Sequence, residues 1–114
     1  MIRTLMLVIV ALFVVSVGPV VAQDAALVEK GMAVYEAQRC RLCHSVADVG
    51  NKKGPLDSVG SKLKAEDMRA WITTPVEMAT TAGATRKPAM KAFTDLSADD
   101  LNALVAYLLS LTGS

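Results

Sequence analysis

The sequence has few of the residues that usually complete a small domain. Its 114 positions contain two cysteines, one histidine, one tryptophan, two tyrosines and two phenylalanines. Cys40 and Cys43 lie so close together that a disulfide between them would constrain the unfolded chain little. Because side-chain burial alone leaves a domain of this size only marginally stable, we expect a bound group to complete the core.

A marked excess of charge of either sign is also absent. The chain has 12 Lys and Arg against 11 Asp and Glu. One of the basic residues, Arg3, belongs to the N-terminal segment, and 12 minus 1 leaves 11 basic against 11 acidic residues beyond it. A chain so close to neutral is not expected to bind nucleic acid.

A long apolar run occurs only at the N-terminus. Residues 5–17 are apolar apart from one serine, and a Gly-Pro break and three small or modest side chains lead to Ala22. This order predicts a secretory signal peptide over residues 1–22 and a single domain over residues 23–114. The alternative is a retained membrane anchor, since the apolar stretch would just span a bilayer. We therefore expect a periplasmic or otherwise exported protein, in contact with a membrane only if this segment is retained.

The rest of the chain has mainly helical patterns. Asp24 and Ser97 are placed to cap the first and last helices, and residues 47–61 and 79–91 have the Gly and Pro content or irregular composition of loops. The expected helical segments are residues 24–39, residues 65–73, a brief turn after Val76 and residues 97–112. No segment predicts a strand. The expected fold is all-α, with three to four short helices between long loops.

Residues 40–44 read Cys-Arg-Leu-Cys-His and match the C-x-x-C-H haem attachment pattern. Two thiols three positions apart on a helical turn can form thioethers with the two vinyl groups of one porphyrin. The next residue then directs its imidazole toward the iron. His44 is the only histidine in the chain, so no other nitrogen of this kind is available as the proximal ligand.

The two cysteines also have other interpretations. A redox-active dithiol usually lies next to a βαβ unit, which the sequence does not predict. A structural zinc site needs four ligands, and a second Cys or His pair is missing. A plain disulfide in an exported protein remains the simplest alternative.

Several short motifs together resemble class I cytochromes c. They are Cys40 to His44, Gly54-Pro55-Leu56, Trp71-Ile72, Met90 to Phe93 and the closing helix from Leu101 to Leu111. The resemblance runs in order through residues 24–112. It implies a small cytochrome c fold wrapped around one covalently bound haem c.

The resemblance also implies roles for individual residues. Gly31 would allow a close, right-angled crossing between the first helix and Tyr107 of the last. The carbonyl of Pro55 would accept a hydrogen bond from the proximal histidine. Trp71 would lie near the haem propionates, with plain core packing as the alternative. The residues expected along the apolar haem crevice are Leu42, Leu56 and Phe93.

The sixth iron ligand is expected to be a methionine, a soft ligand that raises the haem potential. Met90 lies in the loop where this family places its axial ligand, and Met78 is the second candidate. The local sequence departs from many relatives, which have proline directly after this methionine. Here Lys91 follows it and Pro88 precedes it.

With His44 and Met90 both on the iron, no coordination site is open to a substrate. The sequence therefore predicts an electron carrier rather than an enzyme, docking transiently with larger redox proteins at the haem edge. The basic residues expected around this edge are Lys52, Lys53, Arg86, Lys87 and Lys91. The alternatives are a haem-free exported dithiol or disulfide protein, a haem enzyme or gas sensor with a labile sixth ligand, and a cytochrome subunit of a larger dehydrogenase or respiratory complex.

Overall fold

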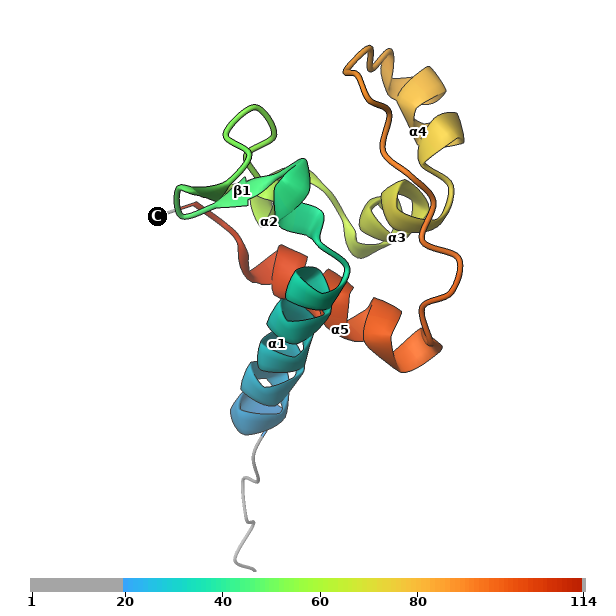
Figure 1. Cartoon of the computed structure of the whole chain (residues 1–114). Coiled ribbons are helices and arrows are strands. Elements are labelled where there is room, and N and C mark those ends of the chain that lie inside the picture. The colour runs from blue at the N-terminus through green and yellow to red at the C-terminus, as the bar shows by residue number, and fades with distance from the viewer. Residues whose placement is uncertain (1–19, 114) are drawn as a thin grey trace, which may run out of the picture.

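The computed structural model describes residues 20–113, with side chains from residue 24 onward. This part of the chain forms five α-helices, one 3-10 helix and one hairpin (Figure 1). The elements in chain order are α1 (Val20–Ala37), η1 (Cys40–Leu42), β1 (Ser45–Val46), β2 (Val49–Gly50), α2 (Val59–Lys62), α3 (Ala65–Thr73), α4 (Pro75–Ala82) and α5 (Ala98–Ser110). The predicted all-α class is confirmed.

The predicted leader, residues 1–22, lies outside the described residues except for its last three, which are in α1. Asp24 is therefore inside α1, and its predicted role as N-cap is wrong. The four residues Val20 to Gln23 contain no glycine or proline, so nothing in their sequence interrupts the helix before Asp24. Among the helices of residues 20–113, none has the length and apolarity of a membrane span.

The α1 helix ends just before the attachment motif. Arg39 has a left-handed backbone with φ 56°, which ends the helical path and starts η1. A short antiparallel hairpin then follows, with Ser45 opposite Gly50, although we predicted no strand. Its turn residues, Ala47 and Asp48, both have positive φ, as in a type I′ turn, but lack the usual Asn-Gly sequence. The hairpin therefore has little signal in the sequence.

α2 replaces predicted loop structure, and α4 extends the predicted brief turn at Val76 into the predicted loop from residue 79. In α2, the Gly60 N–H donates to the Leu111 carbonyl at 2.7 Å. A residue at the end of α5 therefore helps to stabilise this short helix. In α4, Pro75 occupies the first turn, where a proline is well tolerated. The hydroxyls of Thr80 and Thr81 donate to the carbonyls of Val76 and Glu77, one turn back, at 2.9 and 3.0 Å, so both hydroxyls are satisfied within the helix.

The core is built around the crossing of α1 and α5, which Figure 1 shows. Tyr35 packs edge-to-face on Tyr107, with ring centroids 5.5 Å apart. A Cβ on Gly31 would collide with the Ala103 carbonyl oxygen and lie 2.6 Å from the Tyr107 Cβ. The predicted close approach at Gly31 is therefore confirmed. The other buried apolar residues of the core are Val34, Met68, Ile72, Ala103, Leu104, Val105 and Leu108.

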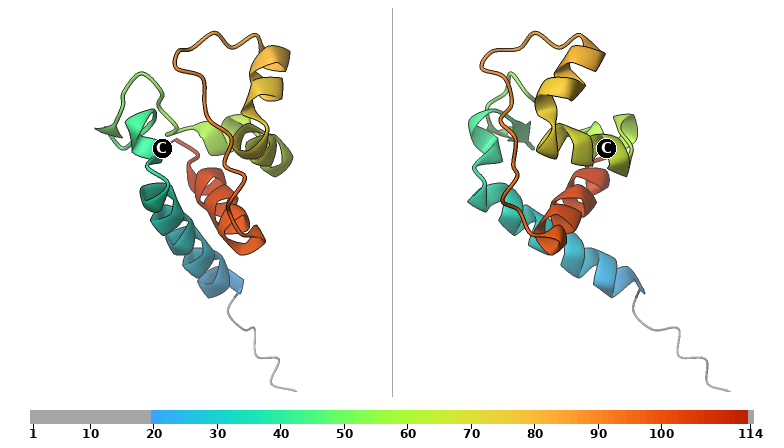
Figure 2. Two further views of the ribbon diagram at one scale, coloured as in Figure 1. Left: turned by 45° about the vertical axis from the view of Figure 1, so that its right-hand side comes forward. Right: turned by 90° about the vertical axis from the view of Figure 1, so that its right-hand side faces the viewer.

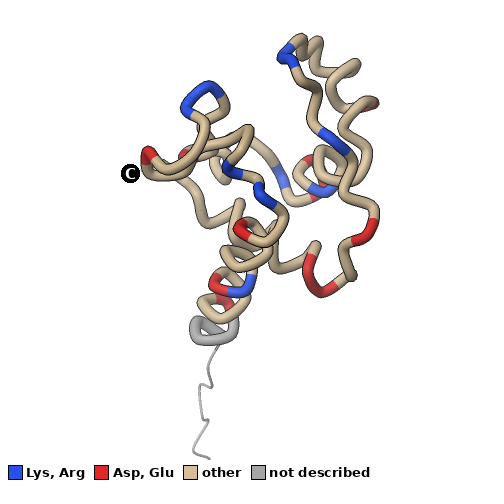
Figure 3. Tube along the Cα trace, in the orientation of Figure 1, with Lys and Arg blue, Asp and Glu red and all other residues tan. Residues whose placement is uncertain are grey.

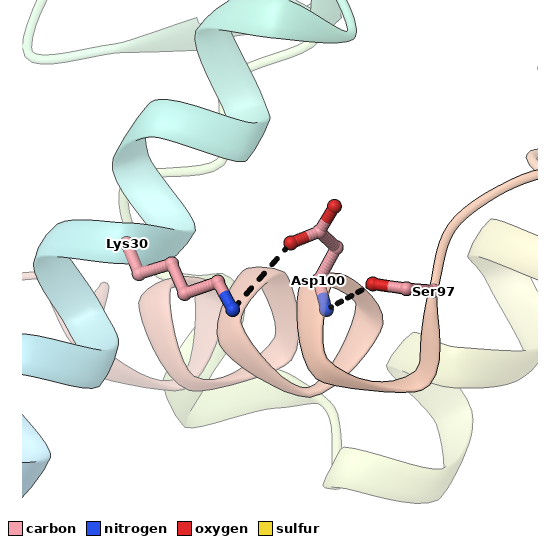
Figure 4. Close-up of polar contacts among 3 residues, drawn as sticks. All are labelled: Lys30, Ser97 and Asp100. Carbon is pink, nitrogen blue, oxygen red and sulfur yellow. Dashed lines mark hydrogen bonds and ion pairs between the residues drawn. The ribbon is translucent and has the colours of Figure 1, made fainter.

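The start of α5 is capped and lies close to α1 (Figure 4). The Ser97 hydroxyl accepts from the Asp100 N–H at 3.1 Å, so the predicted N-cap is confirmed. The Asp100 carboxylate lies 3.6 Å from Lys30 Nζ of α1. Both side chains are nearly half exposed, so this ion pair adds little stability, and packing dominates the crossing.

Gly31→Ala tests the crossing. Helix propensity alone would stabilise the variant by about 1 kcal/mol. We expect instead a loss of about 2 kcal/mol, because the added methyl group has no space between the helices. Chemical denaturation of the protein measures this difference. Met32→Ala, at a half-exposed neighbouring position, should change stability by less than about 0.5 kcal/mol. A Gly31→Ala protein as stable as the parent would contradict the packing argument.

Candidate functional site

A cavity of about 850 Å³ lies between the attachment segment, α3, α4, the loop from Ala84 to Phe93 and one side of α5. Figure 2 shows this loop running from α4 back toward the start of α5. The cavity walls are largely apolar, and its volume is in the range of cofactor sites. The apolar residues that line it include Leu56, Val59, Leu63, Ile72, Pro75, Val76, Ala79, Leu104 and Leu108.

His44 lines the cavity and is held by three hydrogen bonds. Its N–H donates to the Cys40 carbonyl at 3.0 Å, and its carbonyl accepts from the Asn51 N–H at 2.9 Å. Its Nδ1 lies 3.0 Å from the Gly54 carbonyl oxygen. Since a carbonyl can only accept, Nδ1 carries the proton and Nε2 keeps its lone pair. Burial, and secondarily the positive charge of Arg86, lower the pKa of His44, which favours the neutral form that metals bind.

The Gly54 contact corrects one prediction. We expected the Pro55 carbonyl to accept from His44, but the acceptor is the carbonyl one residue earlier. The same Gly54 oxygen also accepts from the Ser45 N–H at 3.1 Å. Pro55 lies beside Ser45 in an isolated bridge and does not line the cavity. Its backbone pairing holds the strand in place, but its carbonyl is not the acceptor for the imidazole.

Cys40 and Cys43 also line the cavity, and both are free cysteines. η1 places them on one helical turn, and the Cys43 N–H donates to the Cys40 carbonyl at 3.1 Å. Burial raises the pKa of Cys40 to about 11. A redox-active dithiol needs a lowered thiol pKa, so this environment disfavours the dithiol interpretation. Within residues 20–113, no group of three or more His, Cys, Asp or Glu side chains could hold a metal ion, which also disfavours a zinc site.

The methionines occupy different environments. Met90 is partly buried and lines the cavity from its loop. Met68 also lines it but lies in α3, only 2% exposed, as a core residue. Met78, the second candidate ligand, does not line the cavity. Met90 is therefore the methionine on a loop that faces the same space as His44.

The other predicted residues are found at the cavity as well. Trp71 is half-buried on α3 and lines the cavity wall. Leu42, Leu56 and Phe93 also line the cavity, and Leu42 is 65% exposed between the two cysteines. The role of Trp71 toward haem propionates stays a prediction.

Tyr35 is a site residue that the sequence did not indicate. It lines the cavity and is 4% exposed, and its hydroxyl has no hydrogen-bond partner. Burial raises its pKa to about 12, so the hydroxyl stays a donor at neutral pH. A buried polar group without a partner is costly unless something else in the cavity satisfies it. Free thiols, an oriented imidazole, apolar walls and this orphan donor together fit a haem.

Two further features were not predicted. Four residues of α4 form one wall of the cavity, and Pro75 could have indicated this helix through its preference for the first helical turn. Arg86 donates from the loop to the Cys43 carbonyl at 2.6 Å. An arginine in a loop has no sequence signature for such a contact.

Together, the fold and the site define a haem-binding domain of the c-type cytochromes. The family described as "Cytochrome C oxidase, cbb3-type, subunit III" matches residues 26–108. The chain belongs to this family, and its domain is a class I cytochrome c that binds haem and transfers electrons.

A curated relative supports the same class. Cytochrome c oxidase subunit 2 of Alkalihalophilus pseudofirmus is 31% identical over 94 residues, an alignment that covers 75% of this chain and 26% of the relative. The chain thus spans about a quarter of the length of that relative. No solved structure matches the chain.

Proposed function

We propose that this protein carries single electrons between larger redox proteins through one haem c, attached at Cys40 and Cys43 and ligated by His44 and Met90. When bound, the haem supplies reversible cycling between ferric and ferrous iron. The observation that carries the proposal is the meeting of both thiols, a neutral imidazole and a loop methionine around one apolar cavity.

The residues of the chain have distinct tasks in this proposal. His44 presents Nε2 in a fixed orientation, because Nδ1 is tied to Gly54. Met90 supplies a soft sulfur that favours reduced iron. The apolar walls exclude water. Because His44 and Met90 would both hold the iron, no site on it would stay open to a substrate, so the protein is proposed to be a carrier rather than an enzyme.

A second candidate role is that of a cytochrome domain or subunit within a larger oxidase or dehydrogenase. The relative named cytochrome c oxidase subunit 2 favours it, since the aligned part is a quarter of a longer protein. In both roles the domain would lie outside the cytoplasm, with residues 1–22 as a removed signal or a retained anchor. The mass of the purified protein and its solubility without detergent distinguish these cases.

Covalent attachment is the first test. We expect the pigment to stay with the protein in acidified acetone, because two thioethers join it to the chain. The Cys40→Ala, Cys43→Ala double variant should release any pigment it holds. A colourless wild-type protein with titratable thiols would support the dithiol alternative instead.

Met90→Ala tests the sixth ligand. We expect loss of the weak near-infrared band of the methionine–iron bond, a lower midpoint potential and binding of carbon monoxide to the ferrous protein. Met78→Ala is the matched control and should change none of these, because Met78 does not line the cavity. If Met78→Ala lost the band and Met90→Ala kept it, the assignment would move to Met78.

The charge around the cavity supports docking to acidic partners. Figure 3 shows basic positions on the loops before α2 and after α4, and acidic positions at the start of α5. Of the predicted basic set, Arg86, Lys87 and Lys91 line the cavity, and Arg39 joins them, whereas Lys52 and Lys53 do not. This local excess exists although the chain carries a net charge of only +1.

Ionic strength tests this steering. Ferricyanide is an anion, so its oxidation of the ferrous protein should slow as salt increases. At physiological ionic strength, salt largely screens the attraction between exposed charges that are more than roughly 8 Å apart. Lys87→Gln should reduce both the rate and its dependence on salt. Lys62→Gln, which removes the same charge at an exposed residue that does not line the cavity, is the control. Rates that do not depend on salt would exclude steering by these residues.

A further inference from the structure

The loop that carries Met90 has few attachments. α4 ends at Ala82, and the loop is still tied to this helix at Ala84, whose N–H donates to the Ala79 carbonyl at 2.8 Å. It is fixed again at Phe93, whose N–H donates to the Ile72 carbonyl at 2.8 Å. Residues 84–89 are all exposed. A segment with this much exposure and so few contacts is expected to open easily.

Between these two attachments, one hydrogen bond connects the loop to the rest of the described structure. In the described part of the chain, the bond from Arg86 Nη2 to the Cys43 carbonyl, 2.6 Å long, is the only hydrogen bond that joins residues 85–92 to another segment. It runs between segments 43 positions apart. One end is four residues before Met90, and the other is adjacent to His44. A charge-assisted donor of this kind forms a stronger bond than a neutral one.

The backbone leaves space for this contact. A Cβ on Gly54 would collide with Arg86 Nη1 and with the Cys43 carbonyl oxygen. The guanidinium therefore lies against a glycine whose own carbonyl accepts from His44 Nδ1. Two guanidinium nitrogens thus approach the segment that positions the imidazole.

From these contacts we propose that Arg86 is a positioning residue: it ties the Met90 loop to the attachment segment and so keeps Met90 on the iron. The inference rests on the proposed His44 and Met90 ligation. This role is distinct from electrostatic steering of a partner. Lys87 carries the same positive charge as Arg86, but among the described residues it forms no hydrogen bond to the attachment segment.

Arg86→Gln and Lys87→Gln form a matched pair, because each removes one positive charge from the same loop. The measurement is the rate at which imidazole binds to the ferric protein at neutral pH, which requires Met90 to leave the iron. We expect Arg86→Gln to bind imidazole about five- to tenfold faster than wild type, from the loss of a hydrogen bond to a charged group at an exposed site. Lys87→Gln should bind it at the wild-type rate. Equal rates in the two variants would overturn the proposal.

A second measurement reads the contact itself. The carbonyl carbon resonance of Cys43 in the ferrous protein should shift in Arg86→Gln and stay in place in Lys87→Gln. An unshifted resonance in Arg86→Gln would show that the tether is absent in solution. A wild-type protein without the methionine–iron band would instead refute the proposed ligation, so the two failures are distinguishable.

Discussion

The hydrogen bond between His44 Nδ1 and the Gly54 carbonyl decides which nitrogen of the only imidazole is free. The Gly54 oxygen is itself fixed by the Ser45 N–H, and Leu56 N–H donates back to the Ser45 carbonyl at 2.8 Å. The orientation of the imidazole therefore depends on a short stretch of paired backbone rather than on side-chain packing. Displacing this stretch would turn the ring even if the cysteines stayed in place.

The same constraint explains why a minimal hairpin occurs in a helical protein. The chain must return from His44 to Gly54 within ten residues so that a carbonyl can meet the imidazole. A two-residue turn at Ala47 and Asp48 achieves the reversal, even though both residues have positive φ, which is costly for non-glycine residues. The Ala47 N–H is satisfied by the Asp57 carboxylate at 2.7 Å, which helps to offset that cost.

Sequence reasoning was most successful where chemistry and periodicity agree. The attachment motif was identified from residue types alone, and α3 and the Ser97 cap followed from helical spacing and capping rules. It failed where long-range contacts decide the structure. The Gly54 acceptor, the orphan hydroxyl of Tyr35 and the contact of Arg86 with Cys43 all join segments that no local pattern brings together. The end of α4 was expected in the loop over residues 79–91, but Thr80 and Thr81 are in the helix and donate their hydroxyls to its carbonyls.

The two sides of the cavity are held very differently, and this asymmetry bears on electron transfer. His44 has three hydrogen bonds of its own, whereas the Met90 loop depends on anchors at Arg86 and Phe93. In the proposed ligation, the imidazole side is rigid and the methionine side is the one that can detach. Because a methionine sulfur prefers ferrous iron, the bond between Met90 and the iron would be weaker in the oxidised state. The loop anchors therefore matter most for the ferric protein. By limiting the movement of Met90 between the two oxidation states, they would keep the geometry nearly constant as the electron arrives and leaves.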